Sequence, residues 1–102
     1  MFLIYTYHMS IKSKLIQLLQ ALENIENEIN LAIFNETEKK VFYTVVTLSN
    51  NNKKCNISDV IDYSCLSRSS VYKALKKLES RSLIEISQSS DDKREFILQP
   101  II

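Results

Sequence analysis

The side chains that could most clearly do chemistry in this sequence are cations and hydroxyls gathered between positions 66 and 81. That span holds five lysines and arginines against one acidic residue, Glu79. Two small hydroxyl residues, Ser69 and Ser70, stand near its start. Cationic side chains neutralise phosphates, and small residues allow a backbone to approach a ligand closely. The pattern therefore favours binding of a phosphate-rich partner over catalysis.

A helix is needed to bring these residues to one face. Ser67 is the expected N-cap of a helix from Arg68 to Arg81. Its apolar face would consist of Val71, Ala74, Leu75 and Leu78. Its opposite face would carry Ser69, Lys73, Lys76 and Ser80, with Tyr72 and Lys77 at the edges. Such a helix fits the major groove of DNA, which is about 12 Å wide, although an ordinary amphipathic helix with solvated lysines shows the same pattern.

A hairpin directly after this helix favours the DNA-binding interpretation. The stretches from Leu83 to Gln88 and from Glu95 to Gln99 alternate as strands do, and Pro100 is expected to end the second one. The polar residues between them predict a turn. A hairpin that follows a recognition helix is a wing, and a basic residue at its tip can enter the minor groove.

The preceding elements complete a helix-turn-helix. Asn35 and Glu38 form a capping box for a helix from Glu36 to about Ser49. Its buried side is expected to be Val41, Phe42, Val45, Val46 and Leu48. The polar residues 50–54 predict a loop, and Cys55 to Ile57 predict a very short strand.

A third helix should follow, with Ser58 as its N-cap and with Val60 and Ile61 facing inward. The turn after it contains Cys65 and Leu66, and Cys65 is expected to be a small buried residue there. Because the sequence has no glycine, its turns must be made by Asn, Asp and Ser instead.

The N-terminal part predicts a long helix that begins at a Ser10 cap and runs to about Ile33. Its apolar residues are spaced alternately by four and three, the pattern of a helix that pairs with another helix. The seam is Ile11, Leu15, Leu18, Leu22, Ile25 and Ile29. We expect this helix to form a homodimer. The alternative is packing on its own domain, since any amphipathic helix has an apolar stripe.

Composition excludes several other functions. The net charge is +1, and the two cysteines, Cys55 and Cys65, lie ten positions apart with one histidine, His8, in the chain. A closed metal site needs more ligands at closer spacing, so we expect no metal and no cofactor. The sequence contains no Ser-His-Asp set or glycine-rich phosphate loop, so we expect no enzyme activity. No stretch is long and apolar enough to span a membrane. Two cysteines in a chain with no secretory signal predict reduced thiols in a cytoplasmic protein.

The chain resembles the MarR-type winged-helix regulators, including their shorter SarA-like branch, over about Thr37 to Leu98. The matching segments are Thr37-Glu38, Ser58-Asp59-Val60-Ile61, Leu66-Ser67-Arg68-Ser69-Ser70-Val71, Leu78-Glu79, Leu83-Ile84-Glu85 and Asp92-Lys93-Arg94. The last segment matches the family's Asp-x-Arg wing motif. The resemblance implies that Arg94 contacts DNA and that Asp92 braces it. It places recognition-helix contacts on Arg68, Ser69, Ser70, Tyr72 and Lys73, and Lys76, Lys77 and Lys93 complete the expected DNA-binding set.

The chain also departs from this family pattern. Cys65 and Ser82 stand where glycine is usual, and Ile61 replaces a usual alanine. The sequence ends at Ile102, whereas family members add C-terminal helices that complete the dimer and help to form an effector pocket. We therefore expect dimerisation through the first helix, with residues 2–7 as a further contributor, and a small-molecule effector is doubtful.

These observations predict a mainly α (α+β) winged helix-turn-helix with a long N-terminal helix and a two- to three-stranded wing sheet. Residues 1–34 would be a tail and dimerisation helix, and residues 35–102 the DNA-binding domain. The expected function is a homodimeric, sequence-specific regulator of transcription, a repressor, that binds double-stranded DNA through helix 68–81 and wing 88–95. Two alternatives are a plasmid or phage centromere- or origin-binding adaptor and a protein-interaction module.

Overall fold

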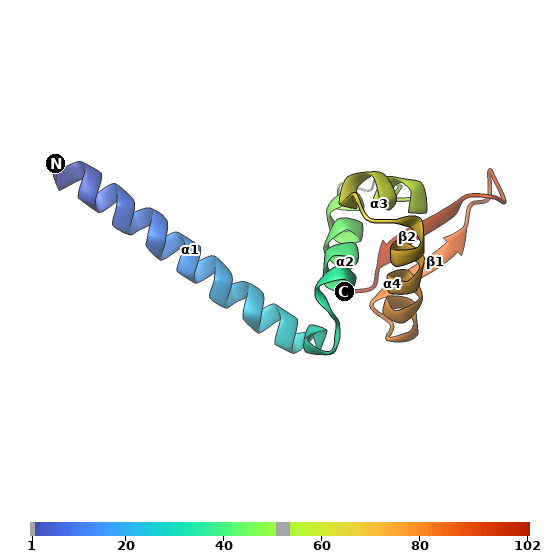
Figure 1. Ribbon diagram of the computed structural model, residues 1–102, viewed down its shortest axis with the longest axis horizontal. Coiled ribbons are helices and arrows are strands. Elements are labelled where there is room, and N and C mark those ends of the chain that lie inside the picture. The colour runs from blue at the N-terminus through green and yellow to red at the C-terminus, as the bar shows by residue number, and fades with distance from the viewer. Residues whose placement is uncertain (1, 51–53) are drawn as a thin grey trace. The chain divides into compact units, whose positions relative to one another are not determined.

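The computed structural model describes residues 2–50 and 54–102, with side chains from Ser10 onward. The elements follow the order α1 (Phe2–Glu28), a 3-10 helix η1 (Leu31–Ile33), α2 (Glu36–Leu48), α3 (Ile57–Ser64), α4 (Arg68–Ser80), β1 (Ile84–Gln88) and β2 (Phe96–Pro100) (Figure 1). The chain divides into two compact units, unit 1 (Met1–Ile33) and unit 2 (Phe34–Ile102). The predicted fold class, a mainly helical winged helix with a small sheet, is confirmed.

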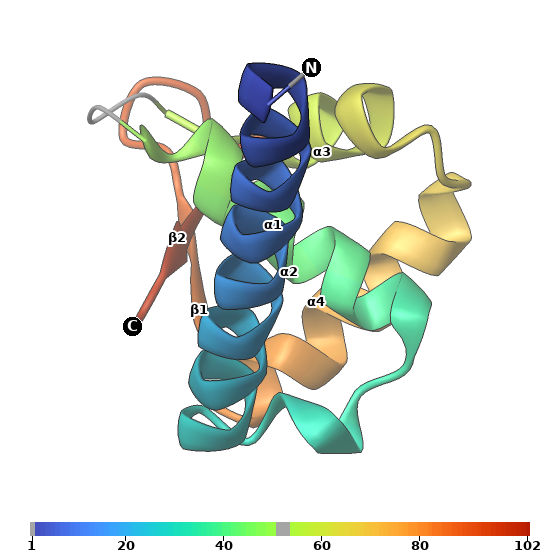
Figure 2. The same ribbon diagram turned by 90° about the vertical axis from the view of Figure 1, so that its left-hand side faces the viewer.

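Unit 1 consists of α1 and η1. Figure 2 shows α1 as one uninterrupted helix. The predicted start at Ser10 was wrong, because the residues before Ser10 continue the helix and leave no free end to cap. The predicted end at Ile33 was also wrong. Asn30 has a φ of 60°, a left-handed conformation that asparagine tolerates and that ends α-helices, and residues 31–33 form the separate 3-10 helix.

Unit 2 is built around α2, which packs against α4, α3 and β2. Its core consists of Phe34, Val41, Phe42, Val45, Cys55, Val60, Val71, Ala74, Leu75, Leu78, Leu83, Ile84 and Leu98. Val46 and Leu48, predicted to be buried, are only half-buried. Thr44 is buried instead, and its hydroxyl donates to the Lys40 carbonyl at 2.7 Å, which satisfies the polar group inside the core.

The helix starts follow from capping side chains. The predicted box at α2 is confirmed, with the Asn35 amide oxygen and the Glu38 carboxylate each accepting the other's backbone N–H at 2.8 Å. Ser67 caps α4 as predicted. The predicted Ser58 cap of α3 was wrong, because Asn56 holds that position. The Asn56 side chain accepts the Asp59 N–H at 2.8 Å, and α3 therefore begins at Ile57.

Two turns of unit 2 use left-handed residues other than glycine. Cys65 ends α3 with a φ of 59°, and Ser82 follows α4 with a φ of 62°. These are the two positions where the family resemblance predicts glycine. The expectation that Cys65 is buried was wrong: its side chain is exposed, and Ser64 occupies the buried position. The Ser64 hydroxyl accepts the Leu66 N–H at 3.3 Å, which fixes the turn between α3 and α4.

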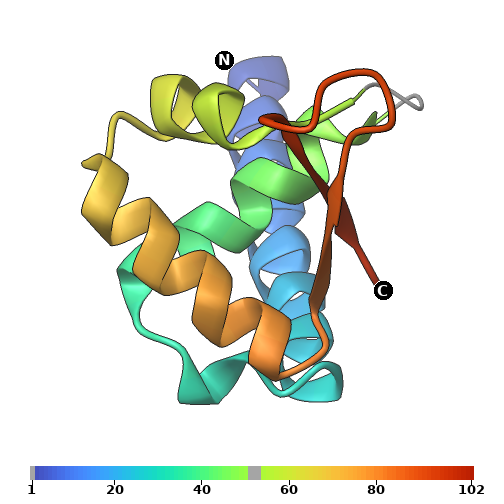
Figure 3. The ribbon, with the colours of Figure 1, turned by 90° about the vertical axis from the view of Figure 1, so that its right-hand side faces the viewer.

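In the view of Figure 3, the hairpin lies at one side of unit 2 and α4 lies at the opposite side. The strands β1 and β2 pair antiparallel, from Ile84 opposite Pro100 to Gln88 opposite Phe96. Pro100 ends β2 as predicted and is itself the last residue of the strand. The predicted short strand at 55–57 is reduced to one bridge between Asn56 and Ile97. Most of the predicted loop at 50–54 lies outside the described residues.

The packing of α4 on α2 generates a stability prediction. Leu75 is 1% exposed in the core, so Leu75→Ala should lower the free energy of unfolding by roughly 2–5 kcal/mol, because it removes buried methyl groups and leaves a cavity. Lys76→Ala, on the exposed face of the same helix, should change it by less than about 0.5 kcal/mol. Urea unfolding followed by circular dichroism measures both. Equal effects of the two substitutions would contradict this packing.

Candidate nucleic-acid interface

The exposed face of α4 carries most of the predicted contact residues. Successive helix positions turn by about 100°, which puts Ser69 and Lys76 in the middle of this face. Arg68 and Tyr72 lie on its flank toward the wing, and both are exposed. On the opposite flank, Ser70 and Lys73 line a shallow hollow together with Asn35 and Thr37 at the start of α2. The predicted residues therefore occupy one helix face but line two separate hollows.

The serines at the start of α4 form a connected group. The Ser67 hydroxyl accepts the Ser70 N–H at 3.2 Å and donates to the Ser70 hydroxyl at 2.8 Å. The Ser69 hydroxyl lies 3.3 Å from the Ser67 hydroxyl and is exposed. Ser70 is half-buried. Ser69 is therefore the better placed of the two predicted serines to meet a ligand.

Lys77 lies on the side of α4 that faces α2. Its ammonium is 3.1 Å from a carboxylate oxygen of Glu38 and 5.2 Å from the centre of the Phe34 ring. This ion pair joins α4 to α2. We therefore interpret Lys77 as a residue that holds the recognition helix in place and leave it out of the proposed DNA-contact set.

The Glu38 carboxylate serves two contacts at once. Partial burial raises the pKa of Glu38, but hydrogen bonds from the Asn35 N–H and the Lys77 ammonium lower it by more. The net pKa of Glu38 lies below its ordinary value of 4.5. The carboxylate therefore stays ionised at neutral pH and stabilises both the start of α2 and the position of α4.

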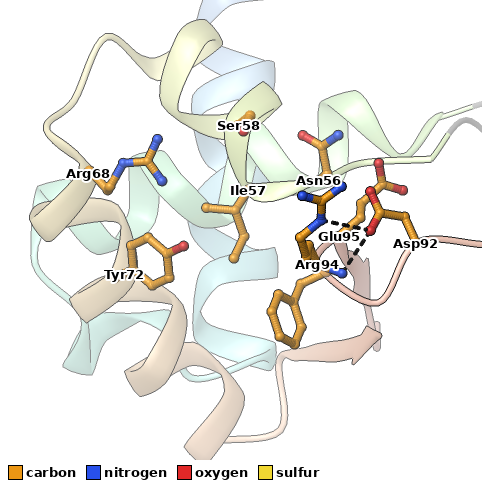
Figure 4. Close-up of a pocket in the computed structure, with 9 residues that line it drawn as sticks. Asn56, Ile57, Ser58, Arg68, Tyr72, Asp92, Arg94 and Glu95 are labelled. Carbon is orange, nitrogen blue, oxygen red and sulfur yellow. Dashed lines mark hydrogen bonds and ion pairs between the residues drawn. The ribbon is translucent and has the colours of Figure 1, made fainter. Parts of the chain in front are cut away.

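In the wing (residues 88–95), Asp92 holds the segment that carries Arg94. A carboxylate oxygen of Asp92 accepts the Arg94 backbone N–H at 2.9 Å and lies 3.5 Å from the Arg94 Nε (Figure 4). The Arg94 side chain is 94% exposed. Lys93 is also exposed, and its carbonyl accepts a hydrogen bond from the Gln88 side chain. The arginine is thus oriented by Asp92 and remains accessible.

Ser89 shapes the wing from its inner side and was not predicted from the sequence. It is 5% exposed, and its hydroxyl accepts the backbone N–H groups of Asp91 at 3.2 Å and Asp92 at 3.4 Å. Its own N–H donates to the Glu95 carbonyl at 2.8 Å. These contacts fix the turn from which Asp92 reaches Arg94.

An open hollow of about 220 Å³ lies between α4, the start of α3 and the wing. Arg68 and Tyr72 line it from α4, Arg94 lines it from the wing, and Asn56 and Ser58 lie between them (Figure 4). Asn56 and Ser58 were missed as site residues because Ser58 was assigned to the N-cap. The spacing of Asn56 and Asp59, which is that of a capping box, was the signal that could have placed Ser58 inside α3.

The predicted seam of α1 is exposed. Ile11, Leu15, Leu18, Leu22 and Ile25 have relative exposures of 45%, 55%, 67%, 41% and 49%, respectively. Ile29 follows α1, is half-buried and still donates its N–H to the Ile25 carbonyl at 3.0 Å. Leucine and isoleucine side chains in such a row favour contact with another apolar surface.

Within the described ranges, no three His, Cys, Asp or Glu side chains are grouped so that they could bind a metal ion. Among the same residues, no helix has the length and apolar character needed to cross a membrane. Burial raises the pKa of the Cys55 thiol to about 11, and the nearby Asp59 carboxylate adds to this shift, so the thiol is protonated at neutral pH.

Sequence comparison identifies a family match over most of unit 2. The family described as "Sugar-specific transcriptional regulator TrmB" matches residues 34–101. No curated protein sequence matches the chain.

Three solved structures have a similar fold. Heme-bound PefR of Streptococcus agalactiae shares 20% identity over 90% of this chain, with a TM-score of 0.59. The adhesin competence repressor AdcR of Streptococcus pyogenes shares 18% over 81%, with a TM-score of 0.57. MarR shares 15% over 88%, also with a TM-score of 0.57. The chain spans 61%, 61% and 64% of these proteins, respectively. The expected likeness to MarR-type winged helices is confirmed at the level of the fold.

The Glu38–Lys77 pair predicts a pH-dependent stability. Because the folded-state pKa of Glu38 is lowered, its contribution is present above the ordinary pKa of 4.5 and is lost as the pH falls through the lower folded value. Glu38→Gln should therefore lower the free energy of unfolding by roughly 0.5–1 kcal/mol at neutral pH, and the difference should shrink in acid. Urea titrations across this pH range measure it. Glu36→Gln, which alters an exposed carboxylate on the same helix turn, should show no comparable gap.

The role of Ser89 predicts a local effect on the wing. Ser89→Ala should speed amide hydrogen exchange at Asp91 and Asp92 by roughly fivefold or more, because both N–H groups lose their acceptor. Exchange within α4 should be unchanged, and Ser90→Ala serves as the neighbouring exposed control. If exchange at Asp91 and Asp92 stays as in the wild type, Ser89 does not fix this turn.

Proposed function

The chain belongs to the TrmB family of transcriptional regulators, and we propose that it binds specific double-stranded DNA as a homodimer and represses transcription. A DNA-binding regulator of transcription is what the family match and the winged-helix fold support together. The way in which this chain contacts DNA, its dimeric state and the sign of its regulation are the proposed parts.

One observation carries the proposed mode of binding: Arg68 and Tyr72 of α4 line the same hollow as Arg94 of the wing. A recognition helix and a wing that face a common space can contact neighbouring grooves of one duplex. The exposed face of α4 would enter the major groove, with Ser69 near the base edges and Lys73 and Lys76 toward phosphates. Lys93 and Arg94 would reach the adjacent minor groove.

The low net charge of +1 does not argue against this proposal, because the charges are distributed unevenly. The acidic side chains between Glu23 and Glu38 lie in α1 and at the start of α2, whereas α4 presents Arg68, Lys73 and Lys76. A protein that is nearly neutral overall can still be attracted to phosphates through one positive face.

The homodimer is proposed from the exposed seam of α1. A dimer brings two copies of α4 to half-sites about one helical turn apart, roughly 34 Å along DNA. Binding at two half-sites is more specific than binding through the exposed face of a single α4. Repression is proposed because a dimer bound over a promoter excludes other proteins from it. The structural relative AdcR is itself named a repressor.

We place the protein in the cytoplasm with its DNA target and propose no catalytic role. The doubt about a small-molecule effector receives no support from the comparisons, because PefR, whose fold is similar, was solved in complex with heme. The partners that we propose for this chain are double-stranded DNA and a second copy.

The DNA contacts predict a selective loss of binding. Lys73→Glu and Arg94→Ala should each weaken binding to a selected DNA site by roughly tenfold to a hundredfold, the loss expected from removing one charged contact or reversing its sign. Both side chains are exposed, so the midpoint of thermal unfolding should stay close to that of the wild type. Fluorescence anisotropy with DNA recovered from a random pool measures the affinities.

Lys40→Glu is the matched control, because it makes the same charge change on the exposed part of α2 and should leave DNA binding within about twofold. The salt dependence should become shallower for Lys73→Glu, since fewer counterions are released. If Lys40→Glu and Lys73→Glu weaken binding equally, the face of α4 is not the contact surface.

A further inference from the structure

We infer that α1 pairs with α1 of a second copy in the antiparallel direction, about a twofold axis close to Gln20. This inference rests on the proposed homodimer and specifies its geometry. The observations that carry it are the exposed seam, the symmetry of its spacing and the separation of charge along the helix.

The spacing of the seam residues is the same in both chain directions. From Ile11 to Ile29 its members are spaced by four, three, four, three and four positions. Reversing the helix about position 20 places Ile11 opposite Ile29, Leu15 opposite Ile25 and Leu18 opposite Leu22. The two inner layers then pair exposed branched side chains of similar volume. In the outer layer, Ile11 meets the half-buried Ile29 just beyond the end of the helix.

The charged residues beside the seam also match in this direction. If Leu15 and Leu22 take heptad position a, Lys12 and Glu26 fall at e, whereas Lys14 and Glu28 fall at g. In antiparallel helices, e residues of one chain face e residues of the other, and g residues face g residues. Lys12 therefore meets Glu26 of the partner subunit, and Lys14 meets Glu28 of the partner subunit. The twofold axis repeats both attractive pairs.

A parallel pair offers none of these contacts. There a g residue faces an e residue of the next heptad, which places Lys14 opposite Leu19 and Ala21 opposite Glu26. The acidic ends of the two helices would also lie together, and so would the basic ends, and like charges at such spacing are destabilising. Charge complementarity therefore selects the antiparallel direction.

The antiparallel direction also covers an apolar residue that lies beside the seam. Leu19 is 57% exposed and occupies an e position next to the axis, where it meets Leu19 of the partner subunit. On the other flank, Ala21 meets its own counterpart, and its small side chain lets the helices approach closely. The seam thus has its widest apolar contact at the centre and its ionic contacts at the ends.

Antiparallel pairing places the C-terminal ends of the two copies of α1, after which the chain continues toward unit 2, at opposite ends of the helix pair. Helix positions rise by about 1.5 Å each, so the two copies of Glu28 would be roughly 25 Å apart along the axis. A parallel pair would bring them together.

Disulfide cross-linking of the full chain tests the direction. In a background in which Cys55 and Cys65 are replaced by serine, Leu15→Cys and Ile25→Cys are prepared separately, oxidised alone and oxidised as a mixture. Antiparallel pairing should give a cross-linked dimer only in the mixture, because the two copies of position 15 lie roughly 15 Å apart, beyond the reach of a disulfide. Parallel pairing would cross-link each variant alone and overturn the inference.

Charge reversal is a second test that needs no cysteine. Lys12→Glu with Lys14→Glu should weaken dimerisation tenfold or more, since the attractive pairs become repulsive. Adding Glu26→Lys and Glu28→Lys should restore it. An unchanged dimer in the first variant, or no rescue in the second, overturns the antiparallel pairing.

Sedimentation equilibrium separates this inference from the proposed function. A wild-type mass of 11.9 kDa at micromolar concentration overturns the homodimer and the helix pairing together. A mass of twice that value with cross-links in the single variants overturns only the direction. A dimer with the expected cross-links but without DNA binding overturns the proposed DNA contacts and supports the pairing.

Discussion

The rest of unit 2 depends on burial of the apolar face of α2. Val41, Phe42 and Val45 are at most 1% exposed, and α2 packs against α3, α4 and β2. Each such side chain contributes about 1.5–3 kcal/mol by leaving water. Because a single helix supports both α4 and the hairpin, the same packing that stabilises the unit also sets the distance between the recognition helix and the wing. The Glu38–Lys77 pair adds a polar contact at one edge of this packing.

Backbone conformation at the turns then sets the directions of the elements that pack on α2. The chain has no glycine, so Cys65 and Ser82 adopt left-handed backbone conformations at a cost of about 1–2 kcal/mol each. Ser82 connects α4 to β1, and beside it the Leu83 N–H donates to the Leu78 carbonyl at 3.0 Å. At the far end of the hairpin, the Ser89 hydroxyl fixes the turn of the wing by accepting backbone N–H groups. The burial around α2 offsets these local costs.

The two units suit different tasks in the proposed regulator. Unit 2 has a closed core and an exposed polar face, as expected of a surface that binds a hydrated, charged duplex. Unit 1 presents an exposed apolar row on a long helix, which suits a second helix of the same kind. Charge also differs between the two units, with acidic side chains toward the end of α1 in unit 1 and cations on α4 in unit 2.

The fold class, the apolar face of α4 and the caps at Asn35 and Ser67 could be predicted from the sequence, because they depend on spacing and side-chain type within a few residues. The same reasoning misplaced the start of α3 and the side chain of Cys65, where two polar residues compete for one cap and where a backbone angle decides exposure. The distinction between Lys77 and the other lysines of α4, and the role of Ser89, became apparent from the packing of the folded chain. Both depend on partners that the folded chain brings close. Lys77 pairs with Glu38 of another helix, and Ser89 accepts backbone N–H groups of the wing turn. Helical or strand periodicity carries no information about such partners.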